Sequence, residues 1–130
     1  MRVLIVDDSV VMRMIVERAL YQLDLGVTEV LQAANGAEAL AALEDDAVSN
    51  SPLDLILSDV HMPVMDGLHF LLERQRLNLA PGVPFVMITA DATDPDLRQA
   101  IANGAQGFIS KPFKLEHLHA ALAPLLLCPA

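Results

Sequence analysis

The sequence predicts an α/β fold built on a parallel sheet, because short apolar runs alternate with longer segments of helical period along its 130 residues. The runs at 3–6 and 55–57 are continuously apolar, which is typical of strands that helices cover on both faces of a doubly wound sheet. The strand at 28–33 is more mixed in polarity, so we expect it at an edge. The predicted strands are residues 2–6, 28–33, 53–58, 84–89 and 107–110.

Capping residues mark where the intervening helices begin. Asn35 has Glu38 three residues later, as in a capping box, and Asp94 stands before a proline at the first helical position. Asp66 similarly precedes a helical segment. Pro124 falls within the apolar stripe of the last helix, so that helix is expected to kink or end there.

Two segments carry no regular pattern. Residues 45–52 are rich in Asp, Ser and Asn, which predicts a loose connection. Residues 125–130 are unusually apolar for a chain end. We expect this tail either to extend the core or to support a contact with a partner or a second copy.

Composition excludes several classes of protein. The formal net charge is −9, whereas affinity for nucleic acid rests on Lys and Arg that neutralise phosphates. No apolar stretch reaches the roughly 20 residues of a membrane span, and the apolar run at the N-terminus is too short for a secretion signal. The single cysteine, Cys128, cannot form an internal disulfide and fits a reducing compartment. We therefore expect a cytoplasmic protein that binds neither nucleic acid nor membranes.

Polar side chains stand where four of the predicted strands end. Asp7 and Asp8 follow the first strand, Asp59 the third, and Lys111 the fifth, while Thr89 ends the fourth. Ligands of open parallel sheets bind beyond the carboxyl ends of the strands, so these side chains are expected to share one edge. Taken singly, the other four have ordinary explanations as helix caps, a strand residue or a solvated charge. Asp59 is harder to explain in this way, because its strand is the most apolar and a buried carboxylate is costly without a partner.

This combination of charges suits phosphoryl chemistry. Three carboxylates and one ammonium leave a local charge of about −2, which favours a divalent cation beside them. Oxygen ligands suit Mg²⁺, with Mn²⁺ as the alternative. A phosphoryl group in transfer spreads charge over three oxygens, which the metal, Lys111 and the Thr89 hydroxyl can each meet. Asp59 then acts as the nucleophile and forms an aspartyl phosphate.

Several separated motifs together resemble the receiver domain of two-component response regulators. The resemblance covers residues 2 to about 122 and implies a flavodoxin-like (βα)5 fold with strand order 2-1-3-4-5. It also implies a cis bond between Lys111 and Pro112. The motifs are Asp7-Asp8, the segment DVHMPVMDG at 59–67, Thr89-Ala90 and Lys111-Pro112-Phe113.

The resemblance implies a phosphoacceptor switch rather than an enzyme with a separate substrate. A sensor histidine kinase or a phosphotransfer protein would pass a phosphoryl group to Asp59, where Lys111 assists. Asp8 and Asp59 would bind the metal ion directly, Asp7 through water, and His61 through its backbone carbonyl. The only chemistry catalysed would be the domain's own phosphorylation and dephosphorylation.

The resemblance also implies how phosphorylation is read out. Thr89 is expected to move toward the phosphoryl group and Phe108 then to turn inward, which requires two packings of similar free energy. The altered surface would be the fourth helix, the fifth strand and the fifth helix, where a downstream protein binds.

Two further residues are expected to affect the lifetime of the phosphoryl group, with the sign left open. His61 lies two residues beyond Asp59, and Asp91 two beyond Thr89, at positions that flank the phosphoryl group in this family. The alternative for His61 is that it contributes only its backbone carbonyl and points to solvent.

Three other functions fit the residues less well. A phosphorylation-independent interaction module would not need the complete set of acids, Thr89 and Lys111. A haloacid-dehalogenase-type phosphatase has its acids two apart after the first strand, whereas Asp7 and Asp8 are adjacent. A flavodoxin needs a hydroxyl- and glycine-rich phosphate loop, which residues 9–12 do not supply. We expect residues 1–130 to form a single receiver domain without an output domain, either stand-alone or cut from a longer regulator.

Overall fold

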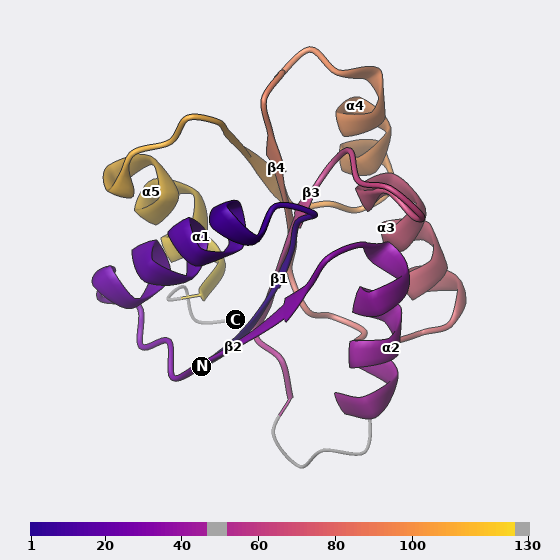
Figure 1. The fold of residues 1–130 in the computed structure, drawn as a ribbon, viewed down its shortest axis with the longest axis horizontal. Coiled ribbons are helices and arrows are strands. Elements are labelled where there is room, and N and C mark those ends of the chain that lie inside the picture. The colour runs from indigo at the N-terminus through magenta and orange to yellow at the C-terminus, as the bar shows by residue number, and fades with distance from the viewer. Residues whose placement is uncertain (47–51, 127–130) are drawn as a thin grey trace.

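Five parallel strands form one sheet in the computed structural model, which describes residues 1–46 and 52–126 (Figure 1). The strands are β1 (Arg2–Val6), β2 (Glu29–Ala33), β3 (Leu55–Asp59), β4 (Phe85–Thr89) and β5 (Gly107–Ser110). Their order in the sheet is β2-β1-β3-β4-β5, which confirms the expected topology and the edge position of β2. β3 begins two residues later than predicted and includes Asp59 as its last residue.

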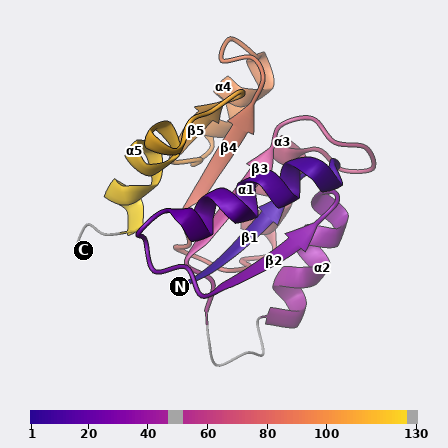
Figure 2. The same ribbon diagram turned by 60° about the vertical axis from the view of Figure 1, so that its left-hand side comes forward.

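Helices cover both faces of this sheet, as the continuous apolar runs predict. They are α1 (Val10–Gln22), α2 (Gly36–Asp46), α3 (Gly67–Arg76), α4 (Pro95–Ala102) and α5 (Leu115–Leu126). Figure 1 shows α1 and α5 on one side of the sheet and α2, α3 and α4 on the other. In Figure 2, α1 and α5 lie side by side in front of the strands. The chain is therefore a three-layer α/β sandwich.

Alternation along each central strand divides the interior into two cores. Leu4 and Val6 of β1 pack in a core with buried residues of α2, α3 and α4. Val3 and Ile5 of the same strand pack in the other core, with buried residues of α1 and α5. Because both faces are covered, the central strands are held firmly and their carboxyl ends form a rigid edge.

The predicted caps begin the helices as expected. Asn35 Oδ1 accepts a hydrogen bond from the Glu38 N–H at 2.9 Å, and Glu38 Oε1 accepts one from the Ala34 N–H at 3.3 Å. This is a variant of the capping box, since the glutamate reaches the residue before the cap. Asp66 and Asp94 cap α3 and α4 through N–H groups of the first turn.

The end of α5 differs from one of the two expected outcomes. The helix continues through Pro124 to Leu126, so it does not end at the proline. Leu118 and Leu122 are fully buried against the sheet, and this packing outweighs the backbone hydrogen bond that a proline cannot donate. Residues 47–51 of the predicted loose connection, and residues 127–130 of the tail with Cys128, lie outside the described residues. Leu125 and Leu126 of the tail are partly buried and extend the core beneath α1 and α5. Among the helices that are described, none is long and apolar enough to cross a membrane.

Candidate functional site

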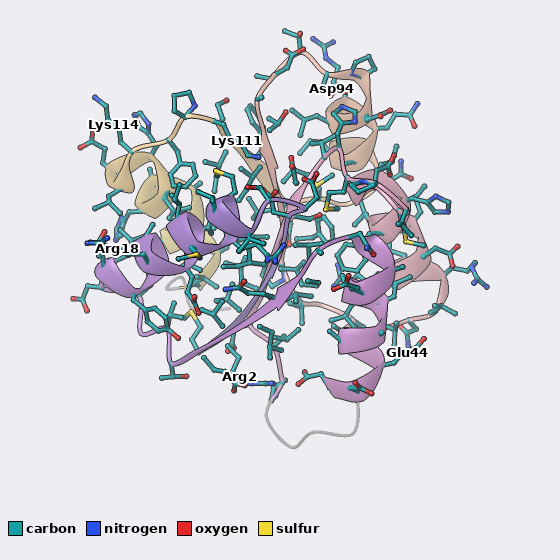
Figure 3. All side chains as sticks on the ribbon, in the orientation of Figure 1. Arg2, Arg18, Glu44, Asp94, Lys111 and Lys114 are labelled. Carbon is teal, nitrogen blue, oxygen red and sulfur yellow. The ribbon has the colours of Figure 1, made fainter. Side chains whose placement is uncertain are left out.

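Four of the predicted site residues meet at the carboxyl edge of the sheet. Lys111 Nζ lies 3.3 Å from Asp7 Oδ2 and 3.4 Å from Asp59 Oδ2. One carboxylate oxygen from each of Asp7, Asp8 and Asp59 lies within 4.8 Å of the others. Figure 3 shows Lys111 at the end of the molecule where the central strands finish, while Arg2 lies at the opposite end. The convergence that strand ends predict is therefore present.

The backbone fixes Asp59 in this cluster. Its Oδ1 accepts a hydrogen bond from the Val60 N–H at 2.9 Å, and the Val60 carbonyl accepts one from the Gly67 N–H at 2.9 Å. A Cβ atom on Gly67 would lie 2.1 Å from the Asp59 carbonyl oxygen, so only glycine fits there. The start of α3 consequently packs directly on the main chain of the predicted nucleophile.

Burial shapes the acidity of Asp59. Its pKa is raised from the ordinary value, first because burial removes water from the carboxylate. The Lys111 ammonium acts against this shift, and the Asp7 charge adds to it. Neither ion pair to Lys111 is short, so the lysine only partly compensates the two acids.

The other two acids differ in their surroundings. Asp7 is buried, and its Oδ1 accepts a hydrogen bond from the Ser9 N–H at 2.9 Å. The Asp7 backbone carbonyl also accepts a hydrogen bond from the Arg13 guanidinium. Asp8 is exposed. The cluster therefore combines fixed carboxylates with one that solvent reaches.

A hard divalent cation fits this set of donors. The carboxylates supply only oxygen ligands, and one ammonium at 3.3 and 3.4 Å leaves the cluster with excess negative charge. Mg²⁺ prefers such oxygen ligands and retains several waters, which the exposed side of the cluster can admit. The expected metal-binding residues are thus compatible with the ion that the sequence predicts.

A backbone hydrogen bond connects Thr89 and Lys111, whereas the Thr89 side chain bonds elsewhere. Thr89 is buried, and its hydroxyl donates to the Asp91 carbonyl and accepts from the Asp91 N–H, each at 3.0 Å. The Lys111 N–H donates to the Thr89 carbonyl at 2.7 Å. The bond between Lys111 and Pro112 is cis, as expected. The Thr89 hydroxyl is therefore engaged by its own loop and not by the acidic cluster.

Both flanking residues have side-chain partners. His61 Nε2 forms an ion pair or hydrogen bond with Asp94 Oδ2, and this contact raises the pKa of His61. Asp91 Oδ1 accepts hydrogen bonds from both the N–H and the hydroxyl of Thr93. His61 is exposed, but it does not simply point to solvent as one expectation had it. The sequence identified Asp94 only as a helix cap.

Phe108 lies on the outer face of β5 with 44% of its surface exposed. Its inward turn on phosphorylation stays a prediction. Leu97 and Leu118 are buried in the two cores, whereas Ile101 of α4 is 40% exposed. Leu115 of α5 is 43% exposed, so the expected readout surface presents three large apolar side chains to solvent.

An apolar surface beside the site was missed from the sequence. Val11, Met14 and Ile15 of α1 are each about half or more exposed, and Tyr21 continues this surface along the helix. A hollow of about 390 Å³ connects it to the Lys111 loop. The hollow is lined by Met12, Ile15, Ala90, Lys111, Pro112 and Phe113. The clue was the number of apolar residues on α1, which exceeds what one buried stripe needs.

A family model of the response regulator receiver domain matches residues 3–123. The chain belongs to this family. It is therefore a receiver domain of two-component signal transduction, a family of signalling switches.

Individual relatives show the same receiver domain in different contexts. The sensor histidine kinase CheAY of Helicobacter pylori is 34% identical over 116 residues, which are 89% of this chain but 14% of the kinase. The structure of the chemotaxis protein CheY4 of Vibrio cholerae is 38% identical and covers 96% of this chain and 98% of its own, with a TM-score of 0.79. The domain thus spans nearly all of one relative and a small part of another.

A third comparison bears on the acidic cluster. The receiver domain of the sensor histidine kinase PA1611 from Pseudomonas aeruginosa is 28% identical, with a TM-score of 0.80 and coverage of 96% of each chain. That structure has a magnesium ion coordinated in its active-site cleft.

Proposed function

We propose that this receiver domain takes a phosphoryl group onto Asp59 from a sensor histidine kinase or a phosphotransfer protein in the cytoplasm. The observation that carries the proposal is the position of the Lys111 ammonium, 3.3 Å from Asp7 and 3.4 Å from Asp59. Two carboxylates and a lysine at the rigid edge of a parallel sheet suit the transfer of a phosphoryl group. The chain would act as a switch and not on a separate substrate.

The acidic cluster would hold Mg²⁺ or Mn²⁺. Asp8, Asp59 and the His61 backbone carbonyl would bind the ion directly, and Asp7 would bind it through water. A bound ion would neutralise the excess negative charge of the cluster and of the incoming phosphoryl group. The exposure of Asp8 and the oxygen-only donor set support this assignment.

The chain's own groups would carry out the transfer. The Asp59 carboxylate forms a new P–O bond while the P–N bond of the donor phosphohistidine breaks and its electron pair returns to the imidazole. The Val60 N–H and the Gly67 contact hold Asp59 still during this step. Lys111 binds a phosphoryl oxygen and offsets the charge that the acceptor gains.

Phosphorylation would be read out through Thr89. Its hydroxyl would exchange two hydrogen bonds with the Asp91 backbone for one to a phosphoryl oxygen, which would shift the loop between β4 and α4. Phe108, now 44% exposed, would turn inward as space opens beneath it. The surface of α4, β5 and α5 would then bind a downstream protein or a second copy of the chain.

The phosphodonor would dock on the exposed apolar surface of α1. Val11, Met14 and Ile15 lie beside the hollow that reaches Lys111, so a protein that delivers a phosphoryl group to Asp59 would cover them. Contiguous apolar surface of this kind commonly marks a protein interface. His61 and Asp91, which flank the site, would modulate how long the phosphoryl group persists.

The first test is intact mass after incubation with Mg²⁺ and acetyl phosphate. We expect one added phosphoryl group that requires metal, is removed by hydroxylamine and is absent in Asp59→Asn. Asp24→Asn is the matched control, because Asp24 is exposed and distant from the site. Unmodified wild-type protein under every metal condition would instead support a phosphorylation-independent interaction module.

A further inference from the structure

A contact between His61 and Asp94 bridges the two loops that border the acidic cluster. His61 lies in the loop after β3, which carries Asp59 at its end, and Asp94 ends the loop after β4. β3 and β4 are neighbours in the sheet, so these loops stand side by side. Figure 3 shows Asp94 at the same end of the molecule as Lys111. The bridge therefore spans one side of the opening to Asp59.

Asp94 uses its two oxygens for different purposes. Oδ1 accepts a hydrogen bond from the Asp96 N–H at 2.9 Å and so caps α4. Oδ2 contacts His61 Nε2. The Asp94 side chain is 12% exposed and that of His61 is 64% exposed, so the aspartate is the fixed member of the pair. The cap positions the imidazole, and not the reverse.

The contact does not depend on the charge state of the ring. A neutral imidazole with its proton on Nε2 donates to a carboxylate, and so does the protonated ring. The other acids nearby are arranged differently. Asp91 is bonded to Thr93, and Asp96 lies near His61 without a direct hydrogen bond to it.

Without Asp94, an exposed imidazole would sample several rotamers. With it, the ring is held between the loop after β3 and the loop after β4, and His61 is only two residues beyond Asp59 in the chain. An imidazole held between these two loops excludes water from the space that it fills.

We propose that Asp94 is a positioning residue for the phosphorylated state: it holds His61 across the opening above Asp59, where the imidazole limits the access of water to the aspartyl phosphate. The proposal rests on the proposed function, because it concerns the lifetime of that phosphoryl group. Asp94 would thus have two roles, as the N-cap of α4 and as the residue that holds His61.

The kinetic test follows loss of the phosphoryl group after the donor is removed. Asp94→Ser keeps a capping oxygen but is too short to reach His61, and His61→Ala removes the ring. We expect each to speed hydrolysis about fivefold, the rate equivalent of one hydrogen bond, and the double variant to be no faster than either single variant. Asp96→Asn is the matched control and should leave the rate unchanged.

Three kinetic outcomes would overturn the proposal. One is an unchanged rate in Asp94→Ser, and another is an effect of the double variant that equals the product of the single effects. The third is an equal effect of Asp96→Asn, which would indicate a general influence of charge rather than a positioned ring.

A second measurement does not depend on phosphorylation or on metal. Ring ¹⁵N chemical shifts of His61 in metal-free protein should report a hydrogen-bonded Nε2, and Asp94→Ser should move them to those of a free imidazole. A ring signal that Asp94→Ser leaves in place would contradict the positioning role. If the wild type shows the bonded ring but never becomes phosphorylated, the proposed function fails while the contact stands.

Discussion

Two regions at opposite ends of the sheet hold buried charge in different ways. At the amino end, the Arg74 guanidinium donates hydrogen bonds to the carbonyls of Leu79, Ala80 and Val83 at 3.1, 2.6 and 2.8 Å. It also lies 5.9 Å from the ring centroid of Phe85, and no carboxylate among the described residues pairs with it. Arg74 ties the loop between α3 and β4 together.

At the carboxyl end, Asp59 has far less support. One backbone N–H and an ammonium at 3.4 Å are its partners, and another acid lies beside that ammonium. Burial raises the pKa of Asp59, because these contacts do not replace the water that it loses. A buried charge with complete hydrogen bonds stabilises a fold, whereas one with incomplete partners is available for a ligand or a reaction.

The largest expected effect is at the amino end. Arg74→Leu leaves three backbone carbonyls without their donor, which should lower the free energy of unfolding by about 3 kcal/mol. The rate of phosphorylation by acetyl phosphate under native conditions should stay within twofold of the wild type. Urea denaturation and intact mass measure the two quantities. Arg76→Ala, which removes an exposed ion pair with Glu73, should cost far less, because solvent screens that pair.

Gly67→Ala should affect both stability and chemistry. Its new methyl group meets the Asp59 carbonyl, so the loop or the strand end must shift, at a cost of about 2 kcal/mol. We expect phosphorylation to slow by more than about tenfold, because the acceptor is displaced. Gly107→Ala is the control, since a Cβ there meets no atom within 4 Å. Normal phosphorylation of Gly67→Ala would show that the close approach does not position Asp59.

Asp59→Asn should stabilise the metal-free protein at neutral pH, by on the order of 1 kcal/mol. Because burial raises the pKa of Asp59, the folded state binds this proton more tightly than the unfolded chain. The resulting stability is present below the ordinary pKa and is lost as pH rises through the raised one. The difference between variant and wild type should therefore shrink as pH falls. Thermal unfolding in EDTA at several pH values tests the sign, and a destabilised variant at neutral pH would contradict it.

The smallest effect on stability is expected on α1. Met14 is 60% exposed, so Met14→Ser should change the free energy of unfolding by less than about 0.5 kcal/mol. Phosphotransfer from the partner kinase should slow by about tenfold, as for an interface residue, while phosphorylation by acetyl phosphate stays the same. Leu72→Ser on α3 is the control, because Leu72 is also an exposed apolar residue on a helix. If Met14→Ser accepts the phosphoryl group from the kinase as fast as the wild type does, α1 is not part of the docking surface.

The strand pattern predicted the sheet and the edge at which the site lies, because apolar periodicity and strand ends follow from the residues alone. The convergence of Asp7, Asp59 and Lys111 follows from that topology. The strand order itself came from the resemblance to a known family, since periodicity does not say which strands pair.

Other features depend on packing that one sequence does not encode locally. An arginine near the end of a helix is usually solvated, and nothing in its neighbours indicates that Arg74 is buried among carbonyls. The contact of His61 with Asp94 depends on the conformations of two loops. For α1, the sequence is apolar on more than one face, so it does not reveal which residues the protein itself covers.

The division of the interior into two cores has a consequence for how such domains diversify. Side chains of α1 pack in one core and those of α4 in the other, on opposite faces of the strands. Under the proposed function, changes on the α1 side would alter which donor is recognised without disturbing the packing beneath α4. In a cell with many parallel signalling pathways, the choice of input and the choice of output can thus evolve as separate traits of one small domain.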